Sequence, residues 1–326
     1  MQVTKLFLPE SAQLALPLDA RTREYVQHAK SANTTRAYRS AFLDFSQFCR
    51  GRGVPALPAT PQIVMDYLIT LADTGRKAAT LQVRLAAISF AHHAAHAPDP
   101  TQDDAVKILM QGIRRKIGTA PAQKNPVTRD VLQQLVDAET NDLRGIRNKA
   151  MFLLAFAGAF RRSELIALDV ADIQIGTREM IVRVRRSKTD QEGRSLKKRI
   201  PLLNANPALC PVRAVQTWMR AADILRGPLF RAIDRWGHVR KTRMSDRDLA
   251  LFVKSAARRA GLDSTVFAGH SFRAGFVTQA ASDNVPEWEI QRVTTHKSGD
   301  VLRRYIRDEG IGQSHAIGIA LGENAK

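Results

Sequence analysis

The sequence has few of the features that mark several large classes of protein. Only two cysteines occur, Cys49 and Cys210, with no CxxC pair and no Cys/His cluster at metal-ligand spacing. This scarcity argues against a disulfide framework and a zinc site, and it predicts two reduced, buried thiols. Neither GxxxxGK[ST] nor GxGxxG is present, so no nucleotide cofactor is indicated. We therefore expect no cofactor and no bound metal.

Long apolar runs are absent as well. No stretch approaches the roughly 18 apolar residues of a membrane-spanning helix, and the N-terminus MQVTKLFLPE lacks the pattern of a signal peptide. The sequence therefore predicts no membrane segment, and we expect a cytoplasmic protein of the nucleoid.

Negative charge is scarce relative to positive charge. The 326 residues include 50 Lys and Arg but only 31 Asp and Glu, which gives a formal net charge of +19. This excess is larger than solubility requires and favours a polyanionic partner such as nucleic acid. The hydrophobic content of 44% is that of a globular protein, and the length is sufficient for two domains with their own cores.

The first part of the chain reads as an arm followed by helices. Residues 1–20 contain two prolines, and a flexible arm is expected there. Apolar residues then recur at helical spacing over 21–118, in segments such as SANTTRAYRSAFLDFSQFC and PATPQIVMDYLITLADTG, which predicts a bundle of four or five helices. The stretch TAPAQKNP at 119–126 is typical of a linker. A second domain is expected over 127–326.

Within 127–326 the spacing of apolar residues changes from a helical pattern to a strand pattern and back. RNKAMFLLAFAGAF predicts a buried helix, whereas DVADIQI, EMIVRVRR and SLKKRIPL are short β-rich runs separated by turn-like residues. Helical patterns return in CPVRAVQTWMRAAD and MSDRDLALFVKSAARRAG. The expected fold class is mainly α with a small antiparallel β-sheet: an N-terminal helical bundle and an α+β domain.

The segment from His270 to Tyr305 concentrates groups suited to phosphoryl transfer. His270 and Arg273 are spaced to share one face of a helix, and His296 and Tyr305 follow. A tyrosine ionises near pH 10, so attack of its oxygen on a phosphodiester needs a base or strong positive charge nearby. Arginines supply that charge and also bind the non-bridging oxygens. Taken one at a time, each of these residues is more often explained by packing, hydrogen bonding or surface charge than by catalysis.

A second group of charged residues lies upstream. Arg161 follows the apolar helix in AFRRSELIAL, and Glu164 is spaced so that its carboxylate can hold the guanidinium. Because burial of an unpaired charge is costly, this arginine should be either exposed or paired. Lys188 lies in RSKTDQEG, a predicted turn between two of the expected strands, where a lysine is normally solvated.

In their order and in the kind of element that carries each, these residues resemble the tyrosine recombinase (phage integrase) family. The resemblance covers about 21–326 and depends on six positions: Arg161, Lys188, His270, Arg273, His296 and Tyr305. It implies that the tyrosine attacks the scissile phosphate to form a 3′-phosphotyrosyl bond. The arginines would bind the phosphate oxygens, the lysine would protonate the leaving 5′-oxygen, the first histidine would take the phenol proton, and the second would donate to the phosphate. Glu164 would orient an arginine, and neither ATP nor metal would be needed.

The resemblance also implies partners. These are double-stranded DNA with inverted half-sites, and further copies of the chain in a homotetramer on two DNA sites, formed by exchange of a C-terminal helix. Arg36 and Arg84 in the helical bundle, and Arg247 in SDRDLALF, match positions that contact DNA in the family. One departure is Thr295, because many members have a glycine directly before the second histidine.

Two other functions stay open on the sequence. A type IB topoisomerase uses a similar set of residues to relax supercoiled DNA, and an architectural DNA-binding protein would share the charge without cleaving. The N-terminal bundle and the apolar C-terminal tail favour recombination over relaxation, which needs no exchange between protomers. The six filled positions argue against a non-cleaving protein.

Overall fold

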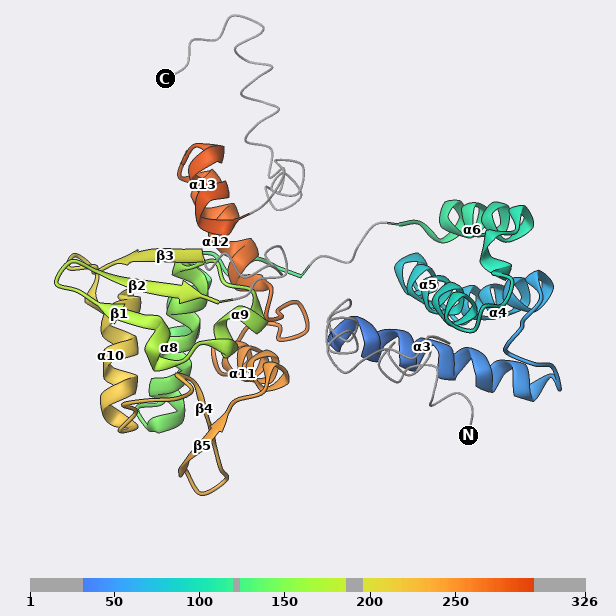
Figure 1. The fold of residues 1–326 in the computed structure, drawn as a ribbon. Helices are drawn as coiled ribbons and strands as arrows, with labels where there is room; N and C mark the ends of the chain where they lie inside the picture. The colour runs from blue at the N-terminus through green and yellow to red at the C-terminus, as the bar shows by residue number, and fades with distance from the viewer. Residues whose placement is uncertain (1–31, 120–123, 186–195, 296–326) are drawn as a thin grey trace, which may run out of the picture. The chain divides into compact units, whose positions relative to one another are not determined.

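The computed structural model describes residues 32–119, 124–185 and 196–295, and it divides the chain into two compact units, Met1–Ala122 and Gln123–Lys326 (Figure 1). Each unit has a hydrophobic core of its own. None of the helices in these residues is long and apolar enough to cross a membrane.

The N-terminal unit is helical. Its described elements are α3 (Ala32–Gly51), α4 (Pro61–Asp73), α5 (Ala78–Ala94), the short 3₁₀ helix η2 (Pro100–Gln102) and α6 (Asp104–Ile117). The sequence sets the start of α4, because Thr60 accepts a hydrogen bond from the Ile63 amide and Pro61 occupies the first turn. Aromatic residues of α3 fill the core, with the Phe45 ring 5.1 Å from that of Tyr67.

A buried histidine joins α5 to the segment before α4. His92 is fully buried, and its Nε2 accepts a hydrogen bond of 2.9 Å from the Ala59 amide. Its Nδ1 lies 2.8 Å from the carbonyl oxygen of Ile88, which accepts only if Nδ1 carries the proton. Burial lowers the pKa of His92, so the neutral ring with this one tautomer satisfies both partners.

The C-terminal unit combines helices with two small sheets. Its helices are α7 (Arg129–Asp137), α8 (Leu143–Ala157), α9 (Arg162–Ala167), η3 (Val170–Asp172), η4 (Pro207–Leu209), α10 (Pro211–Ala221), α11 (Asp246–Arg259), α12 (Ser271–Ser282) and α13 (Glu287–Thr294). The predicted apolar helix is α8, whose residues 150–155 are all buried. It packs against α10 and α12 and forms the centre of this unit (Figure 1).

The larger sheet confirms the three predicted β-rich runs. Its strands are β1 (Ile173–Ile175), β2 (Glu179–Val184) and β3 (Leu196–Pro201), antiparallel in the order β1-β2-β3. Lys198 and Ile200 of β3 are buried, whereas Lys197 and Arg199 are exposed. The alternation places one lysine of SLKKRIPL on the inner face of the sheet.

A second sheet was not predicted from the sequence. It consists of β4 (Arg231–Ile233) and β5 (Val239–Arg243), paired antiparallel with an irregular register. Four of the five β5 residues are exposed, so the strand has no apolar alternation that the sequence could reveal. Contacts of Arg243 with the end of α9 and with Asp169 hold it in place.

Candidate active site

The turn between α8 and α9 places Arg161. After Gly158, Ala159 adopts a left-handed backbone with φ of 44° and Phe160 turns inward to become buried. A Cβ at Gly158 would lie 2.1 Å from the Phe160 ring, so only glycine permits this tight reversal. The reversal brings Arg161 to the N-terminal end of α9, four residues after the largely buried α8 ends at Ala157.

Arg161 and Glu164 form the ion pair expected from their spacing. Nη1 of Arg161 lies 2.6 Å from Oε1 of Glu164, and the Arg161 amide donates a hydrogen bond of 3.0 Å to Oε2. The Glu164 side chain is 4% exposed, so its carboxylate is enclosed and both of its oxygens are engaged. This arrangement determines the direction of the Arg161 guanidinium.

Arg273 enters the same region from α12. Its side chain is buried, and Nη1 donates a hydrogen bond of 2.8 Å to the carbonyl oxygen of Ala159. Nη2 donates to the carbonyl oxygen of Thr294 at the end of α13. The second predicted arginine therefore contacts the turn that carries the first.

His270 lies one turn before Arg273 and is exposed. Its backbone angles are helical, and its carbonyl oxygen accepts a hydrogen bond of 3.1 Å from the Ala274 amide, so it extends α12 by one residue. The neighbouring Gly269 lies against the aliphatic part of Arg162, where an added Cβ would be 2.9 Å from Cδ. His270 is thus held beside the start of α9.

Sequence reasoning missed a third cation, Lys198 of β3. Its side chain is buried, and burial lowers its pKa to about 8, with Glu164 acting against this shift and Arg273 and Arg161 adding to it. We call Arg161, Glu164, Lys198 and Arg273 the cationic cluster, because it has three cationic side chains and one carboxylate. The period-two pattern of SLKKRIPL was the signal that could have shown a lysine pointing inward.

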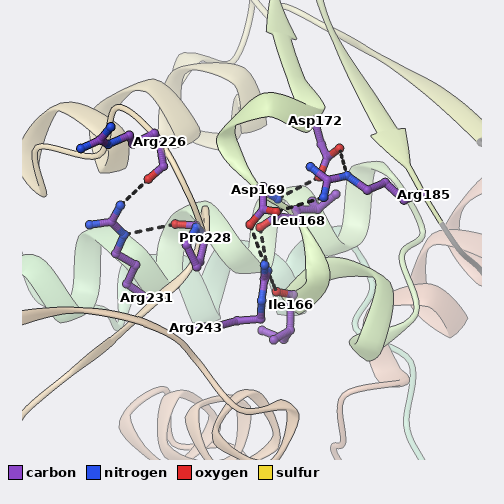
Figure 2. A network of polar contacts seen from close by, with 9 residues as sticks. All are labelled: Ile166, Leu168, Asp169, Asp172, Arg185, Arg226, Pro228, Arg231 and Arg243. Atoms are coloured by element: carbon purple, nitrogen blue, oxygen red, sulfur yellow. Dashed lines mark hydrogen bonds and ion pairs between the residues drawn. The ribbon is translucent and has the colours of Figure 1, made fainter.

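A polar network fixes the elements that follow Arg161 (Figure 2). Nη1 of Arg243 donates to the carbonyl oxygens of Ile166 and Leu168 at the end of α9, at 2.6 and 3.0 Å, and Nη2 lies 2.6 Å from Oδ1 of Asp169. On the other side of Asp169, Arg185 contacts its Oδ2 at 3.2 Å and Oδ1 of Asp172 at 2.7 Å. These contacts hold β5 against α9 and anchor the end of β2.

The same network holds the segment that leads into β4. Nε of Arg231 donates to the carbonyl oxygen of Pro228, and Nη2 donates to that of Arg226 (Figure 2).

The Arg185 contacts also bear on the predicted site, because Arg185 directly precedes residues 186–195, in which Lys188 lies. Arg185 itself is held close to the residues that follow α9.

The predicted site residues have different outcomes. Arg161, Glu164 and Arg273 come together, and His270 directly precedes α12, about one turn before Arg273. Lys188, His296 and Tyr305 lie outside the described residues. Over 32–119, 124–185 and 196–295, no three or more His, Cys, Asp and Glu side chains are grouped so that they could hold a metal ion.

The three arginines predicted to contact DNA differ in exposure. Arg36 on α3 and Arg247 in the first turn of α11 are exposed. Arg84 is partly buried and points at α3, where it lies 3.3 Å from the carbonyl oxygen of Ser40 and 3.5 Å from Oδ2 of Asp44. Arg84 thus joins two helices in addition to any role at the surface.

The cationic cluster is suited to binding a tetrahedral anion. Guanidinium groups bind phosphate oxygens in bidentate fashion, and positive charge held in place before the reaction stabilises charge that develops in the transition state. The elements that carry the cluster are separate in sequence, namely α9, β3 and α12. Arg273 and Lys198 both contact the turn before Arg161, through the carbonyl oxygen of Ala159 and the ring of Phe160, so the positions of the charges are set in advance.

Comparison with known proteins gives consistent matches along the chain. Residues 125–310 match the phage integrase family, and residues 23–97 match the phage integrase N-terminal SAM-like domain. An integrase/recombinase XerD homologue of Selenomonas ruminantium is 38% identical over 304 residues, covering 92% of this chain and 89% of the relative. The Cre recombinase of Escherichia phage P1 is 24% identical over 322 residues, covering 90% of this chain and 92% of the relative.

Solved structures share the fold. A lambda integrase tetramer bound to a Holliday junction has a TM-score of 0.56 at 18% identity, with 95% of this chain and 77% of that chain covered.

Proposed function

The chain belongs to the phage integrase family and is a tyrosine recombinase, and on this premise we propose that it cleaves and rejoins duplex DNA through a 3′-phosphotyrosyl intermediate. In the proposed reaction, Oη of Tyr305 attacks the scissile phosphorus while the bond from phosphorus to the 5′-oxygen breaks. His270 takes the phenol proton and Lys188 gives a proton to the departing 5′-oxygen. The phosphotyrosyl bond retains the energy of the phosphodiester, so rejoining reverses the same steps.

The other residues of the proposed site stabilise charge. Arg161 and Arg273 bind the non-bridging oxygens, and His296 donates a hydrogen bond to them. Glu164 orients Arg161. The observation that carries this proposal is the bond from Arg273 to the carbonyl oxygen of Ala159, two residues before Arg161, because it brings both arginines to one turn.

We further propose that the DNA carries inverted half-sites and that four copies of the chain act on two sites through C-terminal helix exchange, at the nucleoid. The likeness to a tetrameric lambda integrase on a Holliday junction supports this assembly. Arg247 would read a base from α11, and Arg36 would contact the backbone, because both are exposed. Arg84 would act partly by holding α5 to α3. The proposed domains are 21–118 for DNA binding and 127–326 for catalysis, joined by 119–126.

The test begins with selection of duplexes bound by the full chain from a randomised library. A recovered site is then synthesised with a nick a few nucleotides downstream of the scissile phosphate. Cleavage then releases a short fragment that carries the freed 5′-hydroxyl, and its loss traps the 3′-phosphotyrosyl intermediate. The native chain should give a protein–DNA adduct that resists denaturant, and Tyr305→Phe should give none. Tyr38→Phe is the matched control and should form adduct normally, since Tyr38 packs with its ring against Phe90.

Absence of the adduct with the native chain, or its persistence in Tyr305→Phe, would refute the proposed chemistry. The curated relatives are recombinases, which disfavours a topoisomerase or a non-cleaving DNA-binding protein. Recovery of inverted half-sites would further support the recombinase assignment.

A further inference from the structure

We propose that Lys198 is a positioning residue of this site: together with Arg273 it holds the last two carbonyl groups of α13, and so sets where the chain leaves that helix toward His296. The inference extends the proposed function, since it gives a role to a side chain outside the six family positions. It depends on the proposed function only for its effect on cleavage.

The position of Lys198 is determined by the sheet. It lies on the inner face of β3, opposite Val182 of β2, and its side chain is buried. The ammonium lies 5.2 Å from the centre of the Phe160 ring, which belongs to the turn before Arg161. A lysine enclosed in this way needs hydrogen-bond acceptors, because burial of an unsatisfied ammonium is very costly.

The acceptor of this lysine is a helix end. Nζ of Lys198 lies 2.5 Å from the carbonyl oxygen of Val293, and Arg273 donates to the carbonyl oxygen of the next residue, Thr294. The last carbonyl groups of a helix lack partners within the helix and carry partial negative charge. Two cations from different elements therefore bind two successive peptide groups at the end of α13.

The chain turns sharply at this point. Thr295 has a left-handed backbone with φ of 59°, and its amide donates to the carbonyl oxygen of Gln291 at 2.6 Å. Thr294 is fully buried, and its Oγ1 donates to the carbonyl oxygen of Ile290 at 2.8 Å. Because the carbonyl groups of Val293 and Thr294 are held as well, the end of α13 is fixed up to Thr295.

Lys198 also lies close enough to Arg161 and Arg273 for their charges to act on it. Arg161 and Arg273 both repel its charge, whereas Glu164 attracts it. The cost of holding a third cation here would be avoided by a neutral side chain of the same length. Such a residue would lose the hydrogen bond to Val293 and leave Arg273 alone at the end of α13, so we assign the lysine to this contact.

The test compares Lys198→Met with Lys197→Met on the nicked substrate described above. Lys197 is the exposed neighbour on the same strand, which makes it a matched control. We expect the cleavage rate at saturating DNA to fall about 100-fold in Lys198→Met, the order of effect of a misplacement of about 1 Å. The DNA dissociation constant should stay within about threefold of the native value, because the effect is on cleavage and not on binding. Lys198→Arg, which keeps the charge and the donors, should recover most of the lost rate.

A second measurement needs no DNA. Hydrogen exchange of the backbone amides in Glu287–Thr294 should become faster in Lys198→Met and stay native in Lys197→Met. If Lys198→Met does not fold, Lys198→Gln replaces it in both measurements. Should the native chain form no adduct, the proposed function fails, and hydrogen exchange alone still decides whether Lys198 holds α13.

Three outcomes would overturn the assignment. Cleavage and hydrogen exchange at native rates in Lys198→Met would mean that the contact with α13 has no consequence. A parallel loss of DNA affinity would make Lys198 a phosphate-binding residue. Recovery of Lys198→Met cleavage on a substrate with sulfur in place of the bridging 5′-oxygen would make Lys198 the proton donor, because a thiolate leaves without protonation.

Discussion

Arg273 donates a hydrogen bond of 2.8 Å to the carbonyl oxygen of Ala159, which lies 114 positions earlier in the chain. Ala159 is the residue whose left-handed backbone turns α8 into α9, and Arg161 follows two positions later. One contact therefore joins the two arginines that the sequence could only name separately.

Replacement of Arg273 by lysine should abolish most cleavage although the charge is kept. The guanidinium binds the carbonyl oxygens of Ala159 and Thr294 at once, and a single ammonium cannot reproduce this planar arrangement. We expect the cleavage rate to fall about 1000-fold, as for loss of an oxyanion-binding donor. Arg292→Lys, on the exposed side of α13, is the control and should cleave normally. Normal cleavage by Arg273→Lys would remove Arg273 from the site.

Glu164→Gln should weaken the interaction that orients the Arg161 guanidinium, while it preserves the shape of the side chain at position 164. The amide keeps one acceptor oxygen but loses the charge that holds Nη1 of Arg161 at 2.6 Å. A hydrogen bond to a charged group contributes about 1.5–3 kcal/mol, so we expect cleavage to slow by about 10- to 100-fold. Glu179→Gln alters the exposed Glu179–Arg199 pair and should have little effect. Equal rates in the two variants would contradict the orienting role.

Gly275→Ala should destabilise the C-terminal unit. An added Cβ would lie 1.8 Å from the carbonyl oxygen of Val127, whose amide donates to Ser271 at 2.9 Å, so backbone would have to move against backbone. The expected loss is about 3 kcal/mol or more, measured by urea unfolding. Gly112→Ala in α6 has open space around the new methyl group and should instead add about 1 kcal/mol. Similar effects in both variants would show that α12 tolerates a shift.

Stability of the N-terminal unit should fall in mild acid because of His92. Burial lowers the pKa of this ring below the ordinary 6.5, so the unfolded chain takes up the proton first as the pH falls. The stabilisation is present above the unfolded pKa and is lost as the pH falls through the lower folded pKa, when protonated Nε2 can no longer accept from Ala59. Thermal unfolding from about pH 7.5 to 5.5 measures this slope. It should flatten in His92→Gln and persist in His93→Gln, whose side chain is 66% exposed.

DNA binding should depend steeply on salt, and two exposed arginines should affect it differently. Each phosphate contact that is lost lowers the slope of log K against log salt by about 1, and Arg36→Ala should behave in this way for all sequences. Arg247→Ala should instead relax preference at one position of the selected site by about 1–3 kcal/mol. Binding titrations at several salt concentrations on matched and mutated sites separate the two effects. A flat salt response would mean that the net charge of +19 serves another purpose.

The sequence was sufficient for features that depend on neighbours in the chain. Apolar periodicity predicted α8 and the three strands of the larger sheet, and spacing alone predicted that Glu164 holds Arg161. Periodicity and spacing report these features because backbone hydrogen bonding repeats over a few residues. The order of the six family positions predicted the family that the comparisons identify.

Only the tertiary structure decided which distant groups meet. The β4–β5 pair has almost no apolar alternation, and Arg243 fixes it through contacts with residues more than 70 positions away. In the sequence, Lys198 is one of two adjacent lysines with nothing to distinguish them. In the structure, the register of β3 buries Lys198, and its ammonium donates to the carbonyl oxygen of Val293, 95 positions later. Local periodicity predicts on which face of a helix or strand a side chain lies, but it does not predict which distant residue that side chain contacts. The partner is chosen when separate elements pack together and every buried charge must find a donor or an acceptor.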